Sequence, residues 1–182
     1  MSSENLLDRL NKTEEKAYKL LTEFAADEGF GEKIASAFGD DFDNAGIEAL
    51  RQLWIDGDFS GLPAVEIRSA AEINGANGAF SVDTNKIYLA GEYLARNGGD
   101  GNAIADVLLE EIGHFVDAKI NISDAAGDEG AIFSALVQGV QLDQSAIQAL
   151  KTDNDTVVLT LDGKVIQLEQ ADPEISLTIL KD

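Results

Sequence analysis

The chain has 182 residues, of which 45% are hydrophobic and only two are proline. This length and composition predict a folded domain with a sizeable core and exclude a disordered chain. With 34 acidic residues against 13 basic ones, the formal net charge is −21. Because such a field repels phosphate groups and attracts cations, we expect neither nucleic acid nor an anionic membrane as a partner.

The sequence contains no cysteine, which excludes disulfides and thiolate zinc sites. Its first residues, Met-Ser-Ser-Glu-Asn-Leu-Leu, lack a basic segment and a long apolar run, so we predict no N-terminal signal peptide. No apolar stretch has the length that a bilayer requires. These features leave the location open between the cytoplasm and export by a route without such a signal, and they leave the oligomeric state open.

The N-terminal third is predicted to be helical. Apolar residues recur near helical spacing among lysines and glutamates, which predicts a helix over residues 4–27. Shorter amphipathic segments predict helices at 34–38 and 47–55, and Trp54 in the last of these is expected in the core.

The middle of the chain changes to short strands and then returns to helices. Alternation predicts a strand at 64–68, and the segments 79–82 and 86–90 flank a short polar connection typical of a hairpin. After a short helix at 92–95, three further helices are expected, at 102–119, 128–140 and 142–150.

The C-terminal part is predicted to form strands again. Asp162-Gly163 between the alternating segments 156–161 and 164–169 is a strong hairpin signal, and a last extended segment is expected at 175–180. The predicted class is α+β, with N-terminal helices, a small sheet with a central hairpin, a pair of helices with candidate chemistry, and a C-terminal β-hairpin. We predict a single domain over 1–182, made of a helical part (1–60), a central part (61–150) and C-terminal strands (151–182).

The helix predicted at 102–119 carries the only histidine. His114 lies four residues after Glu110 and three after Glu111, and a helix brings such residues onto neighbouring surface. Asp106 and Asp117 fall in the same stripe, opposite an apolar arc, so we expect an amphipathic helix whose acidic stripe faces away from the core. The stripe fits either a solvated acidic surface or a set of metal ligands.

The next helix places a carboxylate within an apolar stripe. Glu129 shares its face with Ile132, Phe133 and Leu136, so its carboxylate has to be paired, capped or bound to a metal. The alternative is that Asp128 and Glu129 complement the helix dipole from the first turn.

These two segments resemble the active-site helices of zincin metallopeptidases. Glu110-Glu111-Ile112-Gly113-His114 is similar to the zincin pattern His-Glu-x-x-His, with glutamate in place of the first histidine. Glu129-Gly130-Ala131-Ile132-Phe133-Ser134-Ala135 resembles the helix Glu-Ala-Asn-x-Phe-Ala-Ala that supplies the third ligand in small gluzincin peptidases of the ImmA/IrrE type. The central part, 61–150, is therefore expected to form a zincin-like core.

The stretch 78–139 also resembles an uncharacterised bacterial family. Its pattern is Leu-Glu-Glu-x-Gly-His-x-x-Asp followed by Gly-Asp-Glu-Gly-x-x-Phe, which the chain matches around His114 and Glu129. Members of that family often belong to longer secreted proteins with calcium-binding repeats. This resemblance implies an accessory module or pro-region of a secreted protein.

The zincin resemblance implies a role for each matching position. Glu110, His114 and Glu129 would bind the metal, and Glu111 would be the general base that deprotonates a metal-bound water. Asp117 and Asp128 would be additional ligands, or would orient the ligands through hydrogen bonds.

The same resemblance implies a strand along which an extended peptide substrate lies. In those folds an edge strand precedes the active-site helix, and the residues that match it here are Ile87, Tyr88 and Leu89. The substrate would be a peptide or protein.

The replaced histidine determines which metal and which function are expected. Two carboxylates and one imidazole make a more anionic ligand set, which would raise the pKa of a zinc-bound water and suits manganese or calcium better than a histidine-rich set does. Zinc is expected if the domain is catalytic. Two hypotheses stay open: a metal-dependent peptidase, and a non-catalytic module that binds a divalent cation or another protein.

Overall fold

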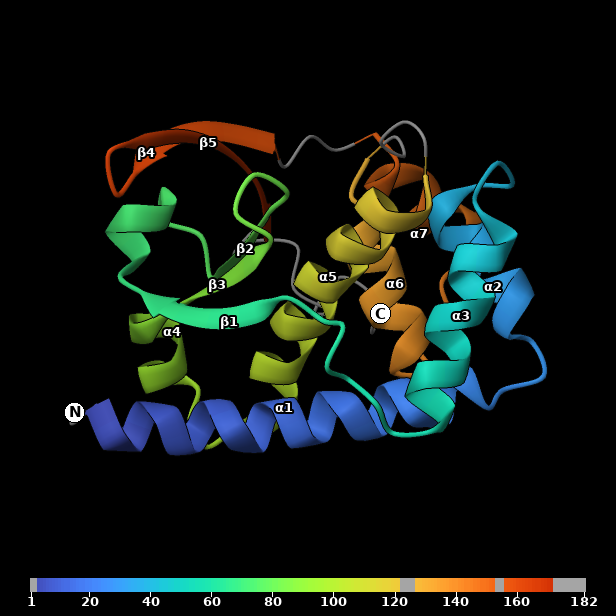
Figure 1. Cartoon of the computed structure of the whole chain (residues 1–182), viewed down its shortest axis with the longest axis horizontal. Helices are drawn as coiled ribbons and strands as arrows, with labels where there is room; N and C mark the ends of the chain where they lie inside the picture. Colours follow the sequence, from blue (N-terminus) through green and yellow to red (C-terminus); the bar gives the residue numbers. More distant parts are fainter. Residues whose placement is uncertain (1–2, 122–126, 153–155, 172–182) are drawn as a thin grey trace.

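The computed structural model describes residues 3–121, 127–152 and 156–171 (Figure 1). Across these residues the chain has the predicted α+β architecture, with seven α-helices and one five-stranded sheet. The strand predicted at 175–180 lies outside the described residues. No helix among the described residues has both the length and the apolar character needed to cross a membrane.

The predicted helices are present, with boundaries that differ by a few residues. Four of them begin behind an aspartate whose side chain accepts a hydrogen bond from a backbone amide of the first turn, which is the favoured N-cap arrangement: Asp43, Asp100, Asp128 and Asp143. The helices are α1 (Ser3–Ala25), α2 (Phe30–Phe38), α3 (Asn44–Ile55), α4 (Gly91–Arg96), α5 (Gly101–Ile120), α6 (Glu129–Val137) and α7 (Gln144–Leu150), together with a short 3₁₀ helix, η1 (Ala70–Ile73).

The strands form one sheet in the order β1-β3-β2-β5-β4. Strand β1 runs parallel to β3, and the other neighbouring strands are antiparallel. The C-terminal hairpin, formed by β4 and β5, therefore joins the central hairpin through β2. The strands are β1 (Ala64–Arg68), β2 (Gly78–Ser81), β3 (Lys86–Ala90), β4 (Thr156–Leu161) and β5 (Lys164–Ala171).

This strand order corrects the prediction that Ile87, Tyr88 and Leu89 form an edge strand. They lie on β3, which pairs with β1 on one side and with β2 on the other. All three residues are buried, because β3 is covered on both faces. An unbroken apolar run of this kind is typical of an interior strand.

The sheet curls so that its two ends approach each other. Arg68, on the edge strand β1, forms an ion pair with Asp162 in the turn of the C-terminal hairpin, with 2.5 Å between Nη2 and Oδ2. Figure 1 shows this hairpin arching over the central strands. A small apolar cluster around Tyr88, Ile73 and Leu168 fills the concave face.

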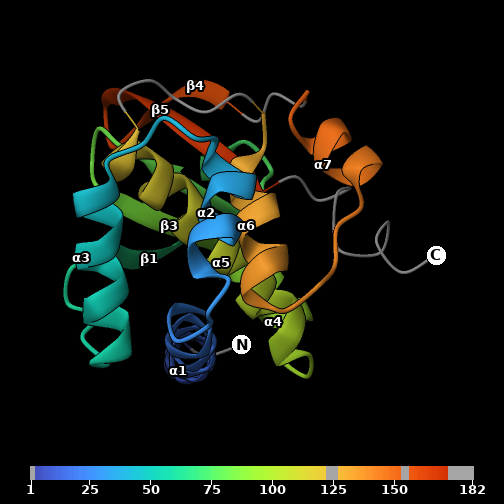
Figure 2. The same cartoon turned by 90° about the vertical axis from the view of Figure 1, so that its right-hand side faces the viewer.

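The other face of the sheet packs against the helices, which contain most of the core. Phe133 of α6 is fully buried and lies at its centre. Its ring centroid is 5.6 Å from that of Phe24, 5.7 Å from that of Phe38 and 6.3 Å from that of Trp54. Phe133 thereby joins α6 to α1, α2 and α3, and Figure 2 shows α2 directly beside α6.

Candidate metal centre

Helix α5 is buried on both of its faces, which corrects the prediction of an acidic stripe turned away from the core. Glu111 and His114 are fully buried, and Glu110 is only 9% exposed. The reason is that α6 packs directly across the acidic stripe. Ser134 Oγ of α6 donates a 2.8 Å hydrogen bond to Oδ1 of Asp106 at one end of this contact.

Two glycines allow α6 to approach α5 so closely. A Cβ atom built on Gly130 would lie 2.6 Å from Nε2 of His114 and 2.7 Å from the carbonyl oxygen of Glu110. A Cβ atom on Gly113 would lie 2.7 Å from the Cα of Gly130. Since real Cβ atoms do not make contacts this short, the imidazole of His114 fits against α6 only because both positions are glycine.

His114 lies among carboxylates from two elements other than its own helix. Its Nδ1 is 2.9 Å from Oε1 of Glu129, on α6, and 3.4 Å from Oε2 of Glu169, on β5. Two ligands of a tetrahedral zinc site with bonds of about 2.0–2.1 Å are about 3.3–3.4 Å apart. The separations around His114 are therefore close to those of a metal site, and all three side chains are buried.

A second group of candidate ligands shares the same histidine. Potential ligand atoms of Glu110, His114 and Asp128 also lie within 4.8 Å of one another. Asp128 caps α6 as well, because its Oδ1 accepts a 2.8 Å hydrogen bond from the amide of Ala131. The structure thus brings Glu110 and Glu129 close to His114 as predicted, but it divides them between two groups.

Glu169 is the candidate ligand that the sequence analysis missed. It lies on β5 with the same orientation as Gln167 and Ala171, so an alternating pattern assigns it to a polar, solvent-facing side. Its side chain is nevertheless buried, because β5 pairs with β2 and passes over α5. No local signal in the sequence indicates this placement.

The predicted general base contacts the sheet. Oε1 of Glu111 accepts a 3.1 Å hydrogen bond from the backbone amide of Ala171, at the end of β5. Glu111 belongs to neither group of candidate ligands. Asp117, one turn after His114, also lies outside both groups, and its Oδ1 accepts a 2.6 Å hydrogen bond from Nδ2 of Asn121.

The electrostatic environment of the cluster disfavours further negative charge. The pKa of Glu110 lies well above its ordinary value, chiefly because the carboxyl group is buried and also because Asp128 and Glu111 are close. His114 opposes this shift in pKa only in part. A bound cation would compensate such a group of carboxylates.

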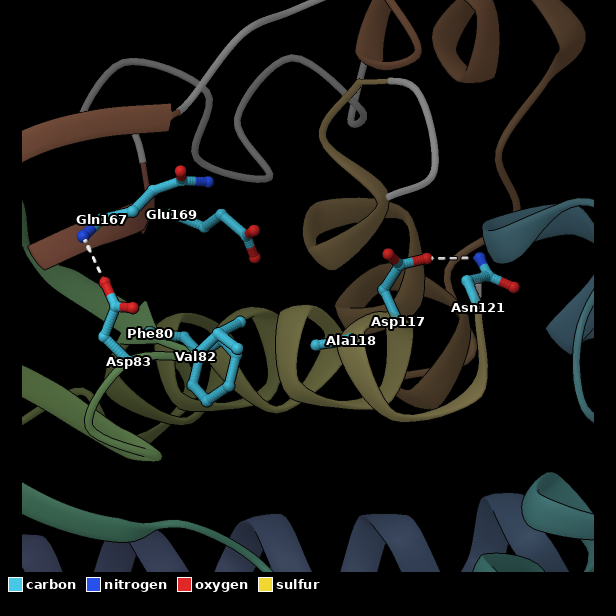
Figure 3. A pocket seen from close by; sticks show the side chains of 8 residues that line it. All are labelled: Phe80, Val82, Asp83, Asp117, Ala118, Asn121, Gln167 and Glu169. Carbon is cyan, nitrogen blue, oxygen red and sulfur yellow. Dashed lines mark hydrogen bonds between the residues drawn. The ribbon is translucent and has the colours of Figure 1, made fainter. Parts of the chain in front are cut away.

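A cavity of about 370 Å³ reaches this region from the surface. Figure 3 shows Glu169 projecting from β5 into it and Asp117 facing it from α5. The remaining lining includes Asn121 beside Asp117, and Phe80 and Asp83 from the central hairpin. Glu169, a candidate ligand, thus forms part of the wall of this cavity, whereas the fully buried His114 does not line it.

Comparisons of the chain with protein-family models, with curated proteins and with solved structures give no match. The resemblance to zincins therefore depends on the motif residues alone. The function has to be argued from the site.

Proposed function

We propose that the domain binds one divalent cation at His114, with Glu129 and Glu169 as the other protein ligands. The observation that carries the proposal is the buried imidazole with two carboxylate oxygens at 2.9 and 3.4 Å from Nδ1. In this arrangement Nδ1 presents its lone pair to the ion, so the ring carries its proton on Nε2. One nitrogen and two oxygens suit zinc or manganese.

The other tautomer of His114 would give the cation a different set of ligands around the same histidine. With the proton on Nδ1, the ring would donate to Glu129 and direct the Nε2 lone pair toward the cation. Glu110 and Asp128, the second group around His114, would then be its partners. Both ligand sets require His114.

The affinity of the metal-free protein for divalent cations tests the proposal directly. Isothermal titration of the metal-free protein with zinc, and separately with manganese, should show one site for at least one of the two ions. His114→Ala should abolish that binding. Glu66→Gln, which changes a carboxylate at the far edge of the sheet, should leave it unchanged. Binding that survives His114→Ala, or no binding of either ion, would contradict the proposal.

The choice of carboxylate variant identifies the site that the ion uses. If Nδ1 is the ligand atom, Glu169→Gln should weaken binding more than Glu110→Gln does. The reverse order would indicate the group that contains Glu110 and Asp128. In either case Glu111→Gln should weaken binding less than the loss of a ligand carboxylate does, because Glu111 belongs to neither group and acts only through its nearby charge.

A peptidase remains a second candidate function, on the strength of Glu111. In the structure this carboxylate is fully buried and accepts a hydrogen bond from Ala171, so a substrate has no access to it while β5 is in place. Cleavage of an unfolded protein such as casein, lost in Glu111→Gln with cation binding intact, would support this function. Without such cleavage, the domain is a cation-binding module.

A further inference from the structure

Strand β5 adds to β2 in the way that an extended peptide adds to the edge of a sheet. It runs antiparallel to β2 over three residue pairs, Gly78 with Ala171, Ala79 with Gln170 and Phe80 with Glu169. Within the C-terminal hairpin, by contrast, β5 pairs with β4 over six residues. Strand addition of this kind supplies affinity through the backbone and specificity through alternate side chains.

The paired part of β5 also contacts the candidate functional residues beneath it. The backbone amide of Ala171 donates to Glu111, and the side chain of Glu169 approaches His114. The first of these contacts needs only a peptide backbone, whereas the second needs a carboxylate.

Gly78 of β2, which pairs with Ala171, leaves room for the carboxylate of Glu111. A Cβ atom on Gly78 would lie 2.6 Å from Oε1 of Glu111, so any side chain at this position would displace the carboxylate that binds the Ala171 amide. We call the side of β2 that pairs with β5 at Gly78–Phe80, together with Glu111 and His114, the strand-binding site. It combines backbone hydrogen-bonding groups with two candidate functional side chains.

The C-terminal hairpin packs its inner face, with Ile166 and Leu168 3% and 0% exposed, into the small apolar cluster of the concave face, and polar contacts hold its margins. Asp162 in its turn pairs with Arg68, and the amide of Gln167 donates to Asp83. Its other face presents Val158 and Val165 to solvent, 64% and 73% exposed. Of the buried apolar residues of the hairpin, only Ala171 belongs to the helical core, so release of the hairpin would open the small cluster and leave the helical core in place.

We propose that the strand-binding site accepts an extended peptide with a carboxylate side chain, and that β5 occupies it in cis until the C-terminal hairpin detaches. This inference rests on the proposed cation site, since it adds a ligand class to the same residues. It explains why the candidate base and histidine are buried beneath a strand that carries its own glutamate.

Disulfide trapping on the metal-free full chain tests the proposal. Ala79 is fully buried on β2, and its partner across the sheet is Gln170, so Ala79→Cys places a single thiol under β5 in a chain without cysteine. The probe is the peptide Lys-Val-Ile-Gln-Leu-Glu-Cys-Ala, the β5 sequence with cysteine at the position of Gln170, activated as a mixed disulfide with thionitrobenzoate. The matched control, Lys-Val-Ile-Cys-Leu-Glu-Gln-Ala, has its cysteine at the position of Gln167.

The peptide that pairs in register should react at least about tenfold faster than the control, because only it brings its sulfur opposite the thiol. Replacing its glutamate by glutamine should slow the reaction about tenfold, the scale of a hydrogen bond to a charged group. Equal rates for the in-register and control peptides, or no effect of the glutamate, would overturn the proposal.

Detachment of the hairpin has its own readout. Asp162→Asn removes the ion pair with Arg68 and keeps a residue that tolerates the positive φ of 51° at this turn. In the Ala79→Cys background it should speed labelling by a small thiol reagent. In the unmodified chain, the amides of β5 should exchange with deuterium faster than those of α5. If both sets exchange only at the rate of global unfolding, the hairpin does not detach and the proposal is wrong.

These measurements need no bound metal. A chain that traps the peptide but binds no cation would contradict the proposed function and keep the strand-binding site. The opposite outcome is a chain that binds a cation at His114 but whose Ala79→Cys variant never exposes its thiol to the reagent. This outcome would support the proposed function and contradict the strand-binding site.

Discussion

Gly113 of α5 and Gly130 of α6 lie in backbone contact, and a Cβ atom on Gly113 would be 2.7 Å from the Cα of Gly130. This contact sets the distance between the two helices, and with it how closely Glu129 of α6 approaches His114 of α5. Because both atoms belong to packed helices, neither can move aside cheaply.

We therefore expect Gly113→Ala to lower the free energy of unfolding by about 1–3 kcal/mol, the usual cost of overpacking a core. Urea unfolding followed by circular dichroism measures it. The matched control is Gly101→Ala in the same helix, where a Cβ atom would meet nothing within 4 Å. There the gain in helix propensity should leave stability unchanged or raise it. Equal losses at the two positions would show that the close approach of the helices is not the cause.

Glu169 connects the C-terminal hairpin to the candidate cation site. Its Oε2 lies 3.4 Å from Nδ1 of His114. We expect Glu169→Gln to weaken cation binding by about 10–100-fold, the scale found when partners around a metal site are removed. Isothermal titration measures the affinity.

The control for Glu169→Gln is Glu66→Gln on the edge strand β1, where Glu66 pairs with Lys86 and Arg68. It removes the same charge from the protein without touching the site. If both substitutions weaken binding equally, the effect is one of net charge and Glu169 is not a ligand.

Glu110 offers a test in the opposite direction. Burial, with Asp128 and Glu111 nearby, raises the pKa of its carboxyl group well above the ordinary value. At neutral pH the folded state therefore disfavours the ionised form of this carboxyl group relative to the unfolded chain. Glu110→Gln keeps the size of the side chain, and in the metal-free protein it should raise the free energy of unfolding by about 1 kcal/mol or more at neutral pH.

The sign of the pH dependence follows from the raised pKa of Glu110. Between its ordinary value of 4.5 and the higher value in the folded state, the folded protein binds the proton more tightly. The contribution of this group to stability thus grows as the pH falls through that window, and the advantage of Glu110→Gln should shrink accordingly. Urea unfolding of both proteins at several pH values measures this. An advantage that stays constant with pH would mean that the carboxyl group of Glu110 does not titrate there.

The elements of the fold could be predicted because their signals are local. The Asp162-Gly163 turn between alternating segments predicts the C-terminal hairpin, which the structure contains. The position of β3 inside the sheet could not be predicted in the same way, because it depends on a parallel pairing between β1 and β3 that no local pattern specifies. The apolar run from Ile87 to Ala90 within β3 was the available clue.

For the site too, residues close together in the sequence could be predicted and the distant one could not. The resemblance of two helical segments to zincins pointed to His114 and Glu129, and the structure brings them to 2.9 Å. Glu169 could not be proposed, since it arrives from β5, 55 positions further along the chain, on a strand whose pattern indicates a solvent-facing side. The burial of the acidic stripe was missed because a stripe of carboxylates predicts exposure unless a second element covers it. That element is α6, and glycine at Gly130 permits the contact.

Tyr93 gives a pH-dependent property outside the cation site. Its hydroxyl donates a 3.0 Å hydrogen bond to the carbonyl oxygen of Ala103. Burial raises its pKa from 10.0 to about 12, and the charges of Asp106 and Glu110 add to the increase. Between these two pH values the folded protein keeps the phenolic proton and the unfolded chain loses it. Stability should therefore decrease as the pH rises through this range.

Absorbance of tyrosinate during an alkaline titration measures this pKa directly. Tyr93 should titrate at about pH 12, and Tyr93→Phe should remove this step. The same variant should lose less stability than the parent between pH 10 and 12, because no buried hydroxyl is left to resist ionisation. Tyr18→Phe is the control, since Tyr18 is also partly buried but stacks on Phe59 instead. If Tyr93→Phe leaves the step at about pH 12 in place, burial and the nearby carboxylates do not raise the pKa of Tyr93 as the structure indicates.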